Sequence, residues 1–408
     1  MRAAMIVAAA LLLGAAAARA AGTSAYNFYP TAVEGSARNV GLGGSPLALP
    51  KDYSAVFVNP AGLGGLAGDG VDFGSDSSNI DNFVVDTSNP KSKALNDPIK
   101  FSFYGLRYVS ADGWGFGFAA QTPYKLDDAF SGTSKIVGRK AGKTVTTTGL
   151  DQTEIQAISR IYSIALAKTY LDKRLSVGMT VNYIQARETY DFTPVFKTTA
   201  PVHIGATGDA FSADLGVLGR PASWLQLAAV YKMGYRVPFD PTRNNQALGT
   251  LGPVTAFRDA ETPDRFSMGV AWMPSRYFHA YVSGDLVLPT KNTVVVGSGL
   301  FPGGTGVLTV GHSETLDGHW GLELIPIDEP DLTVRFWGGG YMEDTALQGG
   351  YRRYHRTAGL AFEPWFLNFS VADDDAEYYN NFTIGVGVDI LGVASRMSKA
   401  TGWSLPIQ

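Results

Sequence analysis

Residues 173–190 read KRLSVGMTVNYIQARETY, and residues 380–390 read NNFTIGVGVDI. In the first stretch the apolar side chains of Leu175, Val177 and Met179 alternate with small or polar ones. Successive side chains of a β-strand point to opposite faces, so this period of two predicts strands with one apolar face. Segments of about ten alternating residues, repeated along a chain, are the sequence pattern of a transmembrane β-barrel.

The same alternation recurs in fourteen segments, and the connections between them are alternately short and long. The predicted strands cover residues 70–78, 99–109, 113–122, 153–171, 173–189, 207–219, 223–236, 264–274, 276–288, 318–326, 331–342, 353–363, 365–372 and 380–390. Tight turns such as 110–112 alternate with polar connections such as 123–152 and 237–263. Outer-membrane barrels have short periplasmic turns and long outer loops, whereas a soluble β-sandwich has no reason to sort its loops by length. The sequence therefore predicts an all-β fold, a 14-stranded antiparallel transmembrane β-barrel.

The N-terminus predicts export. Arg2 precedes the apolar run AAMIVAAALLLGAAAA, which is followed by the small-x-small site Ala18–Arg19–Ala20. This is the pattern of a cleaved signal peptide, and the run is short for a spanning helix. The predicted division is a signal peptide at 1–20, an N-terminal hatch or plug at 21–68, the barrel at 69–391 and a periplasmic tail at 392–408. We expect the mature protein in the outer membrane of a Gram-negative cell, surrounded by its lipid.

Composition argues against several kinds of chemistry. The chain has no cysteine, which excludes disulfides and thiolate sites, and its net charge of −4 argues against nucleic acid as a partner. The five histidines lack metal-ligand spacing, so we expect no metal and no cofactor. His279 near Asp285 could serve a hydrolase, but no nucleophile motif accompanies them, and we expect no enzyme. The acidic run 373–377 lacks EF-hand spacing and is interpreted as a solvated outer loop.

Residues 26–66 do not alternate and are rich in small and turn-forming residues. Asp52 is predicted to cap a helical turn over 53–58, and Asn59 to cap another that begins at Pro60. The glycines of the run 41–44 permit positive φ and close backbone approach. Such a chain could fold back into a barrel lumen and fill it; the alternative is an ordinary N-terminal linker.

Three pieces of this segment carry a resemblance: NVGLGG at 39–44, Asp52 with Ser54, and NPAGL at 59–63. Together they resemble the N-terminal hatch of the FadL family of outer-membrane hydrophobic-compound transporters. The resemblance implies a 14-stranded monomeric barrel with a hatch in its lumen. The residues it implies for shaping and gating the hatch are Asn59, Pro60, Ala61, Asp52, Gly43 and Gly44. It is specific only over residues 39–63, and PorV-like barrels of type IX secretion share the motif.

The third predicted strand contains GWGFGFAAQTPY, which places Trp114, Phe116 and Phe118 on one face and Gly115 and Gly117 on the other. Aromatic side chains suit the lipid face, which leaves the inner wall nearly bare. In the resembled family a kink in the third strand opens a lateral gap, so Gly115 and Gly117 are candidates for a lateral opening. Alternatively, the glycines only accommodate a packed hatch.

The function expected from the resemblance is passive transport of hydrophobic small molecules, either long-chain fatty acids or aromatic hydrocarbons, through a plugged barrel. No ligand-binding residue is identifiable from the sequence. The alternative is a PorV-like barrel that binds or escorts secreted proteins. The compact last third of the chain and its ending TGWSLPIQ, which lacks a final aromatic residue on the last strand, keep that alternative open.

Overall fold

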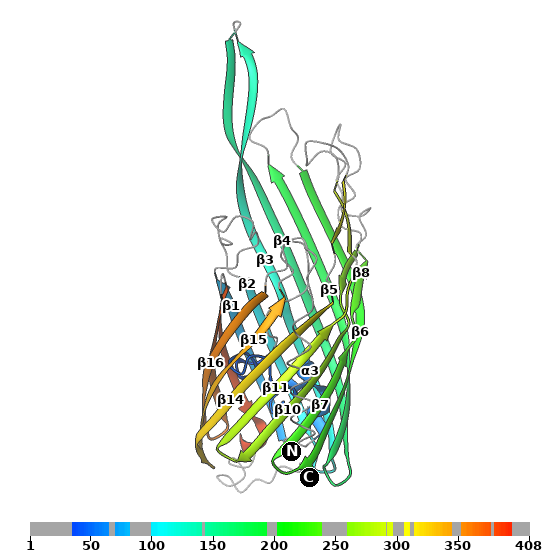
Figure 1. Ribbon diagram of the computed structural model, residues 1–408, viewed down its shortest axis with the longest axis vertical. Helices are drawn as coiled ribbons and strands as arrows, with labels where there is room; N and C mark the ends of the chain where they lie inside the picture. Colours follow the sequence, from blue (N-terminus) through cyan, green and yellow to red (C-terminus); the bar gives the residue numbers. More distant parts are fainter. Residues whose placement is uncertain are drawn as a thin grey trace.

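Fourteen antiparallel strands close into a single barrel in the computed structural model (Figure 1). The structure describes residues 35–64, 70–81, 99–140, 143–193, 202–238, 259–290, 292–296, 306–310, 314–344, 352–376 and 379–393. The predicted signal peptide and most of the predicted tail lie outside these residues. Each strand pairs with its predecessor in the barrel, and the first strand pairs with the last, Asp72 opposite Asp389.

The barrel strands agree with the fourteen predicted from alternation. They are β1 Gly70–Asp81, β2 Ile99–Val109, β3 Trp114–Lys140, β4 Lys143–Tyr170, β5 Leu175–Thr193, β6 Val202–Ala222, β7 Leu225–Lys232, β10 Arg265–Ser275, β11 Phe278–Val287, β14 Thr315–Glu329, β15 Leu332–Asp344, β16 Arg352–Pro364, β17 Leu367–Ala376 and β18 Tyr379–Asp389. The predicted class of fold, a 14-stranded antiparallel β-barrel, is confirmed.

The long connections differ from the prediction. The connection expected at 123–152 is largely strand, because β3 and β4 stay paired as far as Lys140 and Lys143 and form the long hairpin in Figure 1. Two other predicted connections contain short paired strands, β8 Tyr235–Pro238 with β9 Asp259–Thr262 and β12 Asn292–Val296 with β13 Gly306–Val310. Backbone pairing between two strands does not require apolar alternation, so the sequence pattern did not mark these hairpins.

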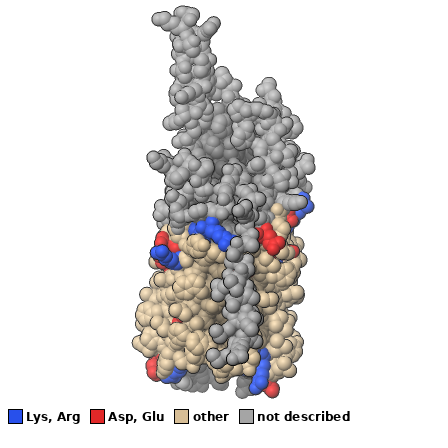
Figure 2. All heavy atoms as spheres, in the orientation of Figure 1, with Lys and Arg blue, Asp and Glu red and all other residues tan. Residues whose placement is uncertain are grey.

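The outer face of the barrel is an apolar belt. Its exposed side chains include Phe116, Ile164, Phe211 and Ile384, and Figure 2 shows charged side chains gathered at the two edges of the belt. Exposed aromatic residues lie at or beside the short turns: Trp114, Tyr170, Trp224, Tyr277 and Trp365. An apolar band with an aromatic rim is the surface of a barrel embedded in a bilayer. Among the described residues, no helix is long and apolar enough to cross a membrane.

Residues 35–64, which we call the inner segment, lie inside the barrel. They form four short helical turns: α2 Ala37–Gly41, η2 Pro46–Ala48, α3 Ala55–Val58 and η3 Pro60–Gly64. All of these residues except Gly35, Gly44, Lys51 and Asp52 are buried. The segment contacts the inner wall on several sides, with α2 against β15–β18, η2 against β7, β10 and β11, and η3 against β2–β6.

Candidate functional site

Glycines on the inner wall make room for the inner segment. A Cβ atom on Gly178 of β5 would collide with the backbone of Pro60, and one on Gly216 of β6 would collide with Asn59. Similarly, a Cβ on Gly321 of β14 would lie 2.7 Å from the carbonyl oxygen of Leu42. The wall is therefore shaped to fit this segment of backbone at several points around the lumen.

The residues implied for shaping the hatch hold local turns. Asn59 is fully buried; its Oδ1 accepts a hydrogen bond from the Ala61 N–H at 3.1 Å, and its Nδ2 donates to the Leu47 carbonyl at 3.1 Å. The first contact is the one expected at the start of the turn that begins with Pro60. Asp52 accepts the Ser54 N–H at 2.9 Å, one residue before α3 begins, and also accepts hydrogen bonds from the hydroxyl groups of Ser36 and Ser54.

Gly43 and Gly44 are needed for their backbone conformation. Their φ angles are +63° and +73°, in the left-handed region that favours glycine. Gly43 also lies against the backbone of Gly340 in β15, where a Cβ atom would be 2.8 Å from the Gly340 nitrogen. Both positions therefore favour glycine: the backbone φ is positive at each, and at Gly43 a Cβ atom would also collide with the backbone of Gly340. A role of these residues in gating remains a prediction.

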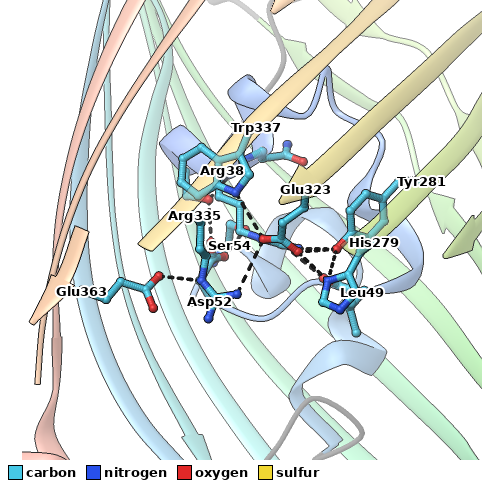
Figure 3. Close-up of polar contacts among 12 residues, drawn as sticks. Arg38, Leu49, Asp52, Ser54, His279, Tyr281, Glu323, Arg335, Trp337 and Glu363 are labelled. Carbon is cyan, nitrogen blue, oxygen red and sulfur yellow. Dashed lines mark hydrogen bonds and ion pairs between the residues drawn. The ribbon is translucent and has the colours of Figure 1, made fainter. Parts of the chain in front are cut away.

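One buried carboxylate joins the inner segment to the wall (Figure 3). Glu323 of β14 accepts from Arg38 of α2 through Nε at 3.0 Å and Nη2 at 3.3 Å. It also accepts from the Tyr281 hydroxyl at 2.6 Å and from Trp337 Nε1 at 3.2 Å, and His279 Nδ1 lies 2.8 Å away. Both partners of the ion pair are buried, Glu323 completely. No local sequence motif marks this cluster, because Arg38 and Glu323 lie 285 positions apart in the chain.

Further hydrogen bonds fasten the inner segment along its length. Asp76 of β1 accepts the Ala37 N–H at 2.9 Å and the Tyr53 hydroxyl. Hydroxyl groups of the wall donate to backbone carbonyls of the segment, Ser176 to Ala61 at 2.6 Å, Thr180 to Val56 at 2.8 Å and Thr357 to Gly41 at 3.0 Å. These donors come from β5 and β16, so the segment is held from opposite sides.

The third strand has the predicted faces but no break at its glycines. Trp114, Phe116 and Phe118 are exposed on the outside, while Gly115 and Gly117 face Leu63 and Val56 of the inner segment. Both glycines are paired with β2 and with β4. This geometry fits the simpler interpretation, that the glycines accommodate the segment. The irregular part of β3 is the register shift between Gln121 and Tyr124 in its pairing with β4.

Two expectations about polar residues change. His279 contacts Glu323, whereas Asp285 lies near His319, Nε2 to Oδ2 3.6 Å, and near Arg265. The acidic run 373–377 was interpreted as a solvated loop, which is wrong for its first residues: Asp373 to Ala376 belong to β17. There Asp374 is buried and accepts from Tyr341 at 2.7 Å, with His355 Nδ1 at 2.7 Å. Within the described ranges no group of three or more residues is placed to hold a metal ion.

The lumen wall of β2–β6 carries an apolar cluster above the inner segment, beside polar residues such as Asn182 and Asp214. Phe103, Ile161 and Ile184 pack with Phe57 and with Val237 of β8 in one buried cluster. A small cavity of about 70 Å³ adjoins this cluster and is lined by Phe57, Ile161, Asn182, Asp214 and other residues of mixed polarity. Its size is well below the roughly 300–1,000 Å³ of pockets that hold drug-sized ligands.

The fold is that of known hydrocarbon transporters. The toluene transporter TbuX of Ralstonia pickettii superposes with a TM-score of 0.57 at 13% identity, over 88% of this chain and 99% of that one. A Pseudomonas aeruginosa FadL homologue gives 0.58 at 13% identity, over 90% and 100%. The toluene transporter TodX of Pseudomonas putida gives 0.54 at 12% identity, over 90% and 99%. The expected resemblance is therefore confirmed for the fold.

Sequence comparison adds nothing to this. No family model matches the chain, and no curated protein sequence matches it. At 12–13% identity the structural neighbours establish a shared architecture, and the function has to be argued from this chain's own residues.

Proposed function

We propose that the protein is an outer-membrane barrel that passes hydrophobic small molecules, and that the inner segment is its plug. The observation that carries the proposal is the apolar cluster on the inner wall of β2–β6, where Phe103, Ile161 and Ile184 face the lumen above the segment. A water-filled porin has a polar interior instead. The structural neighbours include proteins named as toluene transporters and a monoaromatic hydrocarbon channel, which supports the same class of ligand.

Contact with apolar side chains of the wall makes entry of such a molecule favourable in free energy. Removing apolar surface from water is favourable by about 25 cal/mol per Å². A hydrocarbon or fatty acid that reaches the cluster around Phe57 and Ile161 exchanges water for these side chains. A small hydrophilic solute gains nothing there, so the wall selects by polarity and needs no specific hydrogen bonds.

The structure is consistent with a closed state in this scheme. The cavity of about 70 Å³ beside Phe57 has room for a few water molecules and not for a hydrocarbon. Passage therefore requires the inner segment or the neighbouring wall to move. In the proposal Asp52, Asn59, Pro60, Ala61, Gly43 and Gly44 keep the plug in its closed shape. The ligand then leaves either into the bilayer, beside the irregular part of β3, or toward the periplasm.

One observation favours the second candidate, a barrel that binds secreted proteins. The hairpin of β3 and β4 continues well beyond the rest of the barrel wall (Figure 1). β2 pairs with β3 only as far as Thr122, and β5 pairs with β4 only from Gln152. The outer part of the hairpin therefore has two edges to which no other described strand pairs, and unpaired strand edges are surfaces to which another chain can pair.

Uptake into liposomes separates the two candidates. Purified protein in liposomes should speed entry of radiolabelled toluene or oleate over protein-free liposomes, while sucrose stays excluded. The protein acts as a monomer in the proposal, so the rate should rise linearly with the protein-to-lipid ratio. If neither probe enters faster than in protein-free liposomes, transport is wrong and the protein-binding candidate replaces it.

A further inference from the structure

A second, larger cavity lies at the short-turn end of the barrel. Its volume is about 310 Å³, and it separates part of the inner segment from the wall formed by β15–β18 and β1. Apolar side chains line one part of it, among them Trp337 and Phe366. Charged side chains line another part, including Lys51 and Arg335. A space of this size with an apolar wall and a few charges has the character of a small-ligand pocket.

The charges around this cavity leave one cation without a partner. Arg38 pairs with Glu323, and Arg335 pairs with Glu363 through Nε and Oε1 at 3.0 Å. These four groups face Lys51 from α2, β14, β15 and β16, two positive and two negative. Lys51 itself makes no hydrogen bond or ion pair within the part of the chain that the structure describes. Each of these two arginines is therefore paired with a glutamate, and the ammonium group of Lys51 has no carboxylate of the described chain within ion-pair distance.

The remaining carboxylates of the lining already have donors. Asp52 accepts hydrogen bonds from Ser36 and Ser54. Asp72 is paired with Arg107, and Asp389 accepts the Gly392 N–H at 3.1 Å. The charges that act most strongly on Lys51 are those of Glu323, Arg38, Arg335 and Glu363. An anion that enters the cavity therefore meets an ammonium group that forms no ion pair with a carboxylate of the described chain.

We propose that this cavity binds a small organic acid, its carboxylate on Lys51 and its apolar body against Trp337 and Phe366. A partly buried ammonium without a counter-ion is costly, and a charge-assisted hydrogen bond from a carboxylate removes that cost. The apolar wall adds the burial of the ligand's hydrocarbon part. The site does not depend on transport: a barrel that moved no hydrocarbon could still bind the acid, because the cavity opens at the short-turn end.

The pKa of Lys51 predicts how the affinity of the site for an acid depends on pH. Burial lowers this pKa to about 8, from the usual value near 10.5. A carboxylate binds the protonated form, so affinity is full below pH 8 and falls as pH rises through 8. Far enough above that value the loss approaches tenfold for each pH unit, as for any ligand that needs one bound proton. Arginine stays charged over this range, so Lys51→Arg should remove the pH dependence.

Calorimetry on the protein in nanodiscs, with empty nanodiscs as blank, tests the proposal with hydrocinnamate and its neutral analogue hydrocinnamyl alcohol. The wild type should bind the acid more tightly than the alcohol. Lys51→Met should weaken binding of the acid about tenfold or more and leave the alcohol unchanged, while Lys51→Arg stays within about threefold of wild type. Lys173→Met, the same change at an exposed turn of the same end, should behave as wild type.

Several results would overturn the site. They are equal affinity of the wild type for acid and alcohol, no binding of either, an unchanged affinity for the acid in Lys51→Met, or a wild-type affinity that does not fall above pH 8. The first, second and last of these results are measured on the wild-type protein. The proposal can therefore be overturned even if the Lys51→Met variant does not fold. The two tests are independent. A negative result for binding of the acid does not contradict toluene uptake by liposomes, and a negative result for uptake does not contradict binding of the acid.

Discussion

The guanidinium group of Arg38 and the carboxylate of Glu323 form a buried, two-pronged ion pair, with Nε–Oε1 at 3.0 Å and Nη2–Oε2 at 3.3 Å. One partner belongs to the inner segment and the other to the barrel wall. The same carboxylate receives Tyr281 and Trp337 as further donors (Figure 3). A segment held by an interaction of this kind can be released by a single change, which gives the first prediction.

Glu323→Gln keeps the shape of the side chain and removes its charge. Arg38 would then be a buried cation without its partner, which typically costs about 3–5 kcal/mol. We expect a loss of this size in urea unfolding from lipid vesicles, followed by tryptophan fluorescence. The double variant Arg38→Met/Glu323→Gln contains no unpaired charge and should recover part of the loss. Equal losses in the single and double variants would contradict the account of the ion pair.

Asn59→Ala should loosen the plug. The substitution removes the acceptor for the Ala61 N–H and leaves the Leu47 carbonyl without its buried donor, at a cost of about 1–3 kcal/mol. Asn59→Asp keeps the acceptor and loses only the donor, so its effect should be smaller if the turn at Pro60 matters most. Limited proteolysis within residues 35–64, on protein that remains folded by gel heat-modifiability, measures the loosening. Equal protection of wild type and Asn59→Ala would refute it.

Two glycines provide a matched pair of substitutions. A Cβ atom on Gly178 collides with Pro60, whereas one on Gly219 of the neighbouring strand meets nothing within 4 Å. Gly178→Ala should therefore push the plug from its place, at a cost of about 1–3 kcal/mol for overpacking, and let sucrose leak from liposomes. Gly219→Ala should stay sealed. Leakage through both variants, or through neither, would show that the glycine-lined wall does not position the plug.

Labelling of intact cells tests the direction of the barrel. Ser134 lies in the long hairpin of β3, and Ser275 ends β10 beside a two-residue turn. A cysteine at Ser134 should react with an impermeant maleimide, and one at Ser275 should react only after the outer membrane is broken. The chain contains no other cysteine to interfere. The reverse pattern would invert the predicted topology.

The barrel could be predicted from the sequence because the alternation that marks each strand depends only on residues close together in the chain. A strand between lipid and lumen must alternate, so segments such as 173–190 show their two faces directly. The hairpins β8–β9 and β12–β13 carry no such constraint and were missed. Residues 390–393 are described, whereas the rest of the predicted tail and the signal peptide lie outside the structure, so those predictions stand untested.

The site was predictable only where its chemistry is local. Asn59 and Asp52 each accept a backbone N–H two residues later, from Ala61 and from Ser54, and Gly43 needs a positive φ, all of which a short motif can indicate. The Arg38–Glu323 pair and the cavity beside Lys51 depend on how the segment sits in the lumen. A signal for Glu323 existed: it is the one acidic residue at an inward position in the run GLELIPI, residues 321–327.

The central claim is that an apolar molecule passes only when the inner segment moves, and a reversible cross-link tests it most directly. A Cβ atom on Gly269 of β10 would lie 3.0 Å from the Cβ of Leu47, close to the separation of about 3.5–4.5 Å in a disulfide. The double variant Leu47→Cys/Gly269→Cys can therefore lock η2 to the wall. Toluene uptake by liposomes should fall to the rate of protein-free liposomes when the pair is oxidised and recover when it is reduced, while each single variant is indifferent to oxidant. Uptake that continues at the same rate with the disulfide fully formed would contradict the account.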